Sequence, residues 1–140
     1  MSSLRDKIKM SKEEMKLFLD SQTSLQIGTI NKDGRPHLTT MWYFYNGENF
    51  IFHTYTKSQK IINLKRDSRI TVLTEAGNQY SDLQGIIVYG NAEIINGKDN
   101  QEEVIKYMNM VGNKYIKGED STEYLEGMKL QAPKRSVVVV

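Results

Sequence analysis

The sequence contains no cysteine and only two histidines, His37 and His53. The absence of cysteine excludes disulfide bonds, catalytic thiolates and thiolate-ligated metal sites. Neither histidine has a second ligand at the spacing of a metal site such as HExxH, so no metal site is expected. The GxSxG, Walker and GxGxxG motifs are missing as well, which removes the common hydrolase and nucleotide-binding signatures.

Long apolar runs are also missing. The first fourteen residues lack the apolar core of a signal peptide, and no run is long enough to span a bilayer. The run Val137–Val140 is short and suits a buried strand. We therefore expect a cytoplasmic protein, away from membranes, in which residues 1–140 form a single domain large enough for its own core.

The charge balance argues against nucleic acid as a partner. The formal net charge is only +2, which by itself does not indicate a polyanion. Basic residues do gather in one segment, but Asp67 interrupts them and no aromatic residues alternate with them. These basic residues are Lys57, Lys60, Lys65, Arg66 and Arg69.

Capping patterns predict where the main helices begin. Ser11 and Glu14 have the spacing of a capping box, and so do Asp99 and Glu102. A third, shorter helix is expected nearer the end of the chain. The predicted helices cover residues 11–20, residues 100–115 and a segment that starts after Asp120 with Glu123 in its first turn.

Alternating apolar residues and tight turns predict strands. Asp33-Gly34 and Asn46-Gly47 are hairpin signals, so the first three strands should form an antiparallel meander. Gly90 indicates a bulge or bend within a long strand. The predicted strands cover residues 25–30, 37–45, 49–54, 69–74, 85–95 and 134–140. The expected fold is mainly β, a small six-stranded antiparallel barrel with flanking helices, and not a doubly wound sheet.

The segment from Thr54 to Leu64 has the features of a phosphate-binding turn. It follows a predicted strand, and Ser58 stands where the N-cap of a short helix is expected. Helix N-termini present free N–H groups and positive dipole to an anion. Lys57 and Lys60 flank the cap. The alternative is a solvated basic turn. If the segment does hold a phosphate, the thin acid–base inventory implies that a cofactor carries the chemistry.

Four consecutive aromatic residues, from Trp42 to Tyr45, lie on the second predicted strand. Alternation gives that strand two apolar faces, whereas a barrel interior accepts only one. We therefore expect the other face to meet a partner subunit. His53, at a strand end, is interpreted as a structural or cofactor-contacting residue and not as a general base.

Three segments occur in an order typical of one family. The chain contains TxxxDGRPHxTxxW from Thr29, FxTxxxSxKxxNLxxDxRxTxL from Phe52 and GxxVxGxAE from Gly85. Together with the preceding helix, they make residues 10–95 resemble the flavin-binding split-barrel proteins, the pyridoxamine 5'-phosphate oxidase-like group. This resemblance implies a six-stranded Greek-key split barrel that forms a homodimer and binds FMN at the subunit interface.

The resemblance also implies roles for individual residues. Lys60 would pair with the FMN phosphate, helped by Ser58 and Gln59. The family often has arginine at the position of Gln59, and Lys57 would partly replace that charge. His53 and Thr54 would lie near the ribityl phosphate, and Asn63 would support the helical turn. The isoalloxazine edge would run along Leu38, Thr39, Thr40, Met41 and Trp42.

The resemblance leaves the substrate and the cofactor open. Many relatives continue past the position of Val140 with residues that reach the substrate, so the vitamin B6 substrate is not assigned here. Some relatives use a deazaflavin, and others bind haem through histidine. The prediction is an FMN-dependent oxidoreductase acting on a small molecule. The alternatives are a deazaflavin-dependent reductase and a non-catalytic flavin- or haem-binding protein, with His37 or His53 as the haem ligand.

Overall fold

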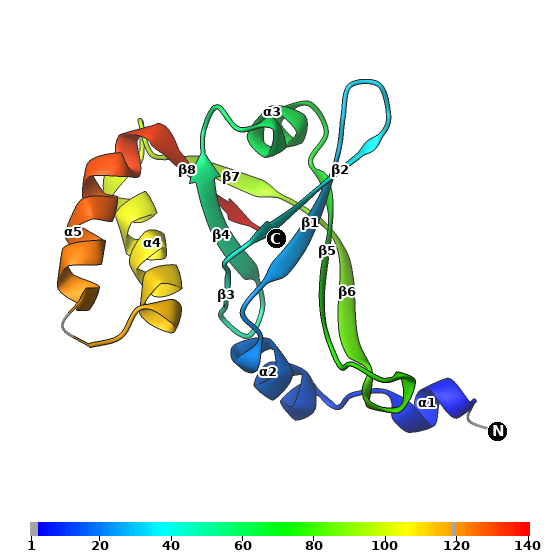
Figure 1. The fold of residues 1–140 in the computed structure, drawn as a ribbon. Helices are drawn as coiled ribbons and strands as arrows, with labels where there is room; N and C mark the ends of the chain where they lie inside the picture. Colours follow the sequence, from blue (N-terminus) through cyan, green and yellow to red (C-terminus); the bar gives the residue numbers. More distant parts are fainter. Residues whose placement is uncertain (1–2, 119) are drawn as a thin grey trace.

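Two four-stranded antiparallel sheets form the centre of the computed structural model, which describes residues 3–118 and 120–140 (Figure 1). The first sheet has the order β2-β1-β5-β6, formed by Pro36–Met41, Leu25–Ile30, Arg69–Ala76 and Gln84–Asn91. The second has the order β3-β4-β8-β7, formed by Phe44–Tyr45, Phe50–Tyr55, Arg135–Val139 and Glu93–Asn96.

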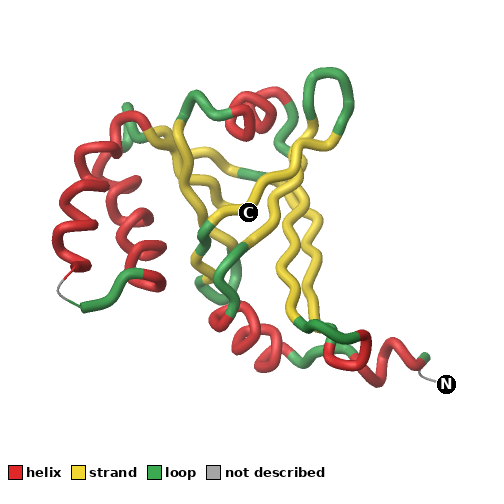
Figure 2. The backbone as a smooth tube through the Cα atoms, viewed as in Figure 1, coloured by secondary structure: helices red, strands yellow, loops and turns green. Residues whose placement is uncertain are grey.

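Five α-helices surround the sheets, and they contribute as much of the described chain as the strands do. The predicted mainly-β class is therefore too narrow, and the structure is a mixed α/β fold. Figure 2 shows helices beside the second sheet, above the two sheets and near the N-terminus. In chain order these are α1 (Leu4–Ile8), α2 (Lys12–Ser21), α3 (Gln59–Arg66), α4 (Gln101–Tyr115) and α5 (Asp120–Gln131).

The predicted helix starts agree with the structure to different degrees. The capping box of Ser11 and Glu14 is present, as predicted. The predicted cap at Asp99 is wrong, because Asn100 is the N-cap of α4 and its side chain makes no capping hydrogen bond. The last helix already includes Asp120, one residue earlier than predicted. Among the described residues, no helix is both long and apolar enough to cross a membrane.

The predicted strand over residues 37–45 is divided, because the chain leaves one sheet and enters the other at Trp42 and Tyr43. The Tyr115 hydroxyl lies 3.1 Å from the Tyr43 backbone nitrogen and 3.3 Å from its carbonyl oxygen. A side chain thus bonds the backbone groups that a neighbouring strand would otherwise bond. The Tyr43 ring is fully buried, and its hydroxyl donates to the Leu19 carbonyl.

The predicted strand over residues 85–95 is divided in the same way, so the described part of the chain forms eight strands in place of the predicted six. Gly90 does not form the break, since it remains paired with Ile70 within β6. The break falls at Ala92, whose N–H donates to the carbonyl oxygen of Ser68 at 2.8 Å. After that residue the chain continues as β7 in the second sheet.

The second sheet is buried on both faces by two separate apolar clusters. On β4, Phe50 and Phe52 belong to the cluster between the sheets, whereas Ile51 belongs to the cluster beneath α4. On β8, Val138 faces the first cluster and Val137 the second. The prediction of a buried strand over the terminal valines is confirmed. Burial on both faces removes the alternation that marks a half-exposed strand.

A close backbone contact at the end of β7 generates the first prediction. Gly97 is buried and donates its N–H to the Arg135 carbonyl at 2.8 Å. A Cβ added there would overlap the carbonyl oxygen of Ala132 and lie 2.6 Å from that of Arg135. Gly97→Ala should therefore lower the free energy of unfolding by about 1–3 kcal/mol or more, measured by urea denaturation.

Gly127→Ala is the matched control. Gly127 lies on α5 with no atom within 4 Å of an added Cβ. Alanine there should be neutral or stabilise by up to about 1 kcal/mol, because alanine has the higher helix propensity. Equal effects at the two glycines would contradict the assignment of the contact at Gly97.

Candidate functional site

The N-terminus of α3 presents an unpaired polar atom. Ser58 is the N-cap, as predicted, but its side chain makes no capping hydrogen bond. Its Oγ is buried and has no hydrogen-bond partner among the described residues. A buried hydroxyl without a partner costs roughly 1–3 kcal/mol, so the N-terminus of α3 has a donor available for a ligand.

Lys60, in the first turn of the same helix, is a buried cation. Its residue is only 8% exposed, and no carboxylate within the described residues lies within 4.0 Å of its Nζ. Burial lowers the pKa of this lysine. The positive end of the helix dipole further disfavours an ammonium at this position. An anion bound beside Lys60 and Ser58 would offset both penalties, so the site fits a phosphate.

The other residues predicted for the phosphate site differ in whether their side chains are available to a ligand. Thr54 is buried on β4, and Lys57 is exposed next to the cap. Gln59 donates its amide to Asn63 Oδ1 at 2.8 Å, so this side chain is already engaged. Asn63 in turn donates to Thr29 Oγ1 at 3.0 Å and to Asn31 Oδ1 at 2.9 Å, which fastens α3 to the end of β1.

The five predicted residues of the second strand do not share one face. Thr39 and Met41 are half-buried, and Thr39 Oγ1 is another buried atom without a partner in the described structure. Leu38 and Thr40 lie on the exposed face of β2, and Leu38 is 72% exposed. Only Thr40, Met41 and Trp42 meet His53, where they line a common pocket.

His53 is held by a residue that the sequence reasoning missed. An N–H of Arg135 donates to His53 Nδ1 at 3.1 Å. Because a guanidinium is only a donor, the imidazole accepts at Nδ1 and carries its proton on Nε2. Burial and the adjacent Arg135 charge lower the pKa of His53 to about 4. The imidazole is therefore neutral near pH 7.

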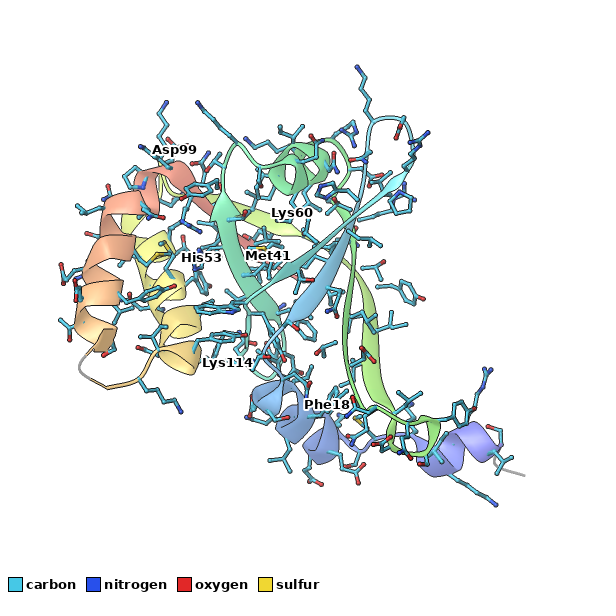
Figure 3. All side chains as sticks on the ribbon, in the orientation of Figure 1. Phe18, Met41, His53, Lys60, Asp99 and Lys114 are labelled. Carbon is cyan, nitrogen blue, oxygen red and sulfur yellow. The ribbon has the colours of Figure 1, made fainter. Side chains whose placement is uncertain are left out.

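The pocket beside His53 has a volume of about 370 Å³. The end of β2 forms one wall, and α5 together with Arg135 forms the other. In Figure 3, Lys60 and Met41 lie toward the space between β4 and β2, and His53 lies toward α4 and α5. The lining residues are Thr40, Met41, Trp42, His53, Tyr124, Met128, Gln131 and Arg135.

Trp42 is fixed at the rim of this pocket. Its ring stacks on Tyr115 with the ring centroids 4.3 Å apart and the planes 2° from parallel. Trp42 nevertheless remains 44% exposed. This contact packs the end of α4 against the tryptophan ring. Positions 42 and 115 are far apart in the chain, so no pattern of neighbouring residues predicts their contact. The only hint for Arg135 is a single basic residue just before the terminal valine run.

The low pKa of His53 generates a pH prediction. The folded pKa is about 4 and the ordinary value 6.5, so the unfolded chain binds the proton more readily between these values. The free energy of unfolding should therefore fall as pH drops from 6.5 toward 4, by at most roughly 3 kcal/mol from this residue. His53→Gln should flatten this slope in urea denaturation, whereas His37→Gln should retain the His53 contribution.

Comparison with known proteins identifies the family. The family model described as pyridoxamine 5'-phosphate oxidase matches residues 11–138. No sequence among curated proteins matches significantly. A conserved hypothetical protein from Mycobacterium tuberculosis is 32% identical, with a TM-score of 0.84 over 99% of this chain and 84% of its own.

Two more distant structures share the fold. An F420 reductase is 19% identical with a TM-score of 0.65, covering 89% of this chain and 90% of its own. The haem storage protein from Vibrio cholerae is 17% identical with a TM-score of 0.67, covering 90% and 85%. The matched family model and the two-sheet architecture agree with the resemblance found in the sequence. The chain belongs to the pyridoxamine 5'-phosphate oxidase-like split-barrel family.

Proposed function

We propose that this protein is a homodimeric FMN-binding oxidoreductase that acts on a small-molecule substrate, with residues 1–140 as one FMN-binding domain. The observation that carries the proposal is the pair of unsatisfied groups at the start of α3. Within the described residues, Lys60 is a buried ammonium without a carboxylate partner, and Ser58 Oγ is a buried hydroxyl without a hydrogen-bond partner.

The phosphate of FMN fits these two groups. Lys60 supplies a charge-assisted hydrogen bond, Ser58 a hydroxyl donor, and the free N–H groups of the first turn of α3 complete the donor set. Lys57 adds a second positive charge from the exposed side of the cap. The Gln59 side chain is bonded to Asn63, so Gln59 contributes through its backbone and through the position of Asn63.

The flavin ring fits along β2 because β2 is an edge strand. It pairs only with β1 in the first sheet, so its other edge keeps unpaired backbone N–H and C=O groups. Successive residues of an antiparallel strand bond the neighbouring strand and point away from it in turn, so alternate residues among Thr39, Thr40 and Met41 would offer free backbone groups to the flavin. When bound, the flavin would accept and donate hydride or single electrons. The residues of this chain bind it, orient it and exclude water.

The cofactor choice is tested directly with absorbance spectra. The protein is titrated separately with FMN, with F420 and with haem, and each spectrum is compared with that of the free cofactor. A shifted flavin spectrum that bleaches on addition of a nicotinamide donor supports the oxidoreductase. A Soret band with haem, or a flavin that stays bound but resists reduction, would replace it with a binding function.

Lys60 provides the sharpest test of the phosphate site. Lys60→Met keeps the aliphatic volume and removes the charge, so it should weaken FMN binding by about 1.5–3 kcal/mol, or roughly ten- to a hundredfold. Isothermal titration calorimetry measures the change. Lys65→Met on the exposed side of α3 is the matched control and should bind FMN normally. Unchanged affinity in the Lys60 variant would refute the phosphate role.

The proposed dimer rests on the outer face of the first sheet. On β5 and β6, Thr71 is paired with Tyr89 and Leu73 with Ile87. These two pairs are two residues apart along each strand, so they lie on the same face of the sheet. Leu38 is 72% exposed, Ile87 54% and Tyr89 81%. An exposed apolar sheet face of this kind is typical of a subunit interface, and β2 lies at its edge.

Tyr89 tests this interface. Tyr89→Glu would place a charge within the apolar face, so it should shift the protein from dimer to monomer in sedimentation velocity. Tyr80 is 94% exposed but lies outside the sheet, in the turn Tyr80–Asp82. Tyr80→Glu should therefore leave the dimer intact. A Tyr89→Glu protein that still sediments as a dimer would place the interface elsewhere.

A further inference from the structure

We propose that the pocket between β2, His53 and α5 binds the carboxylate of a small aromatic or otherwise flat apolar substrate, with Arg135 as the residue that selects the anion. This inference rests on the proposed function and adds a substrate class to it. The pocket shares Thr40, Met41, Trp42 and His53 with the proposed flavin site, so the anion would bind beside the flavin.

Arg135 has unused hydrogen-bonding capacity at this pocket. Its Nε–H donates to Gln131 Oε1 at 3.0 Å, and one Nη1–H donates to His53 Nδ1 at 3.1 Å. A guanidinium has five N–H donors, so three remain without an acceptor among the described residues. The guanidinium also stacks over the Tyr55 ring at 4.3 Å, which fixes its plane.

The charge of Arg135 is also uncompensated. No carboxylate in the described part of the chain lies within 4.0 Å of it, and the eight residues that line the pocket include no aspartate or glutamate. His53 is neutral and offers an N–H at Nε2. The pocket therefore combines one fixed positive charge with neutral donors, which favours an anion.

The remaining lining residues indicate the shape and polarity of the part of the ligand that does not carry the carboxylate. Trp42 is held flat by Tyr115, and Tyr124, Met41 and Met128 add apolar surface. A volume of about 370 Å³ suits a small molecule. A planar fork of N–H donors matches a carboxylate in a bidentate arrangement. These properties select a flat apolar body that carries a carboxylate.

The pocket has a built-in reporter, because Trp42 is the only tryptophan in the sequence. Benzoate is the probe, and benzyl alcohol is the neutral comparison of similar shape. Benzoate titrated into the full-length protein should change the Trp42 fluorescence in a saturable way. Benzyl alcohol should bind at least tenfold more weakly. Equal binding of the two ligands, or no response to benzoate, would overturn the proposal.

A variant that changes charge but hardly changes side-chain shape tests the role of the Arg135 charge without disturbing the fold. Gln131 Oε1 already accepts from Arg135 Nε, so Gln131→Glu gives the guanidinium an internal carboxylate without changing the shape of the pocket. Benzoate affinity should fall at least tenfold, and benzyl alcohol affinity should stay within twofold. Arg135→Lys should also lose the preference for benzoate, because lysine lacks the planar fork. Thermal unfolding verifies that both variants fold.

Different variants test the cofactor proposal and the substrate proposal, so either can be refuted without the other. Lys60→Met should lose FMN affinity and retain benzoate binding, whereas Gln131→Glu should lose benzoate and retain FMN. Benzoate should still bind the FMN-loaded protein and perturb the flavin spectrum. Competitive displacement of benzoate by FMN would show that the pocket is part of the cofactor site and would overturn the substrate assignment. A protein that binds no FMN but binds benzoate through Arg135 would reject only the cofactor proposal.

Discussion

The hydroxyl of Tyr115 bonds the backbone of Tyr43 at the point where the chain passes from one sheet to the other. At this residue the backbone has left the ladder of the first sheet and has not yet joined that of the second, so its polar groups need another partner inside the protein. The same tyrosine ring supports Trp42. One side chain of α4 therefore fixes both the crossing between the sheets and one wall of the pocket.

The surroundings of Tyr43 show how tightly this crossing is held. Lys114, one residue before Tyr115, places its Nζ 3.6 Å from the centre of the Tyr43 ring and donates to the Leu19 carbonyl at 3.3 Å. Burial lowers the pKa of this lysine to about 8. The Tyr43 hydroxyl donates to the same carbonyl. Helices α2 and α4 are thus joined to the β2–β3 crossing through one carbonyl group.

Two cations without carboxylate partners among the described residues organise the candidate site. Lys60 lies at the start of α3, and Arg135 lies at the start of β8, on the face of the second sheet that α5 covers. Burial of an uncompensated charge is unfavourable, so each position gains stability when an anion binds. The two proposals assign these anions to different molecules, a cofactor phosphate at Lys60 and a substrate carboxylate at Arg135. His53 on β4 precedes Lys60 in the chain and contacts Arg135, and burial together with the Arg135 charge lowers its pKa, so the imidazole stays neutral.

The sequence alone determined the features that depend on neighbouring residues. The capping box at Ser11, the alternation of β1 and the strand–turn–helix order around Ser58 are local, and the structure contains all three. The order of the three motifs was enough to identify the family. Only the tertiary structure decided where the two long strands break and which residues face His53. Both depend on contacts between distant positions, such as Tyr43 with Tyr115 and His53 with Arg135, which lies 82 positions later. Such contacts leave no periodic pattern in the chain, because they arise only when the two sheets and the α4–α5 pair pack together.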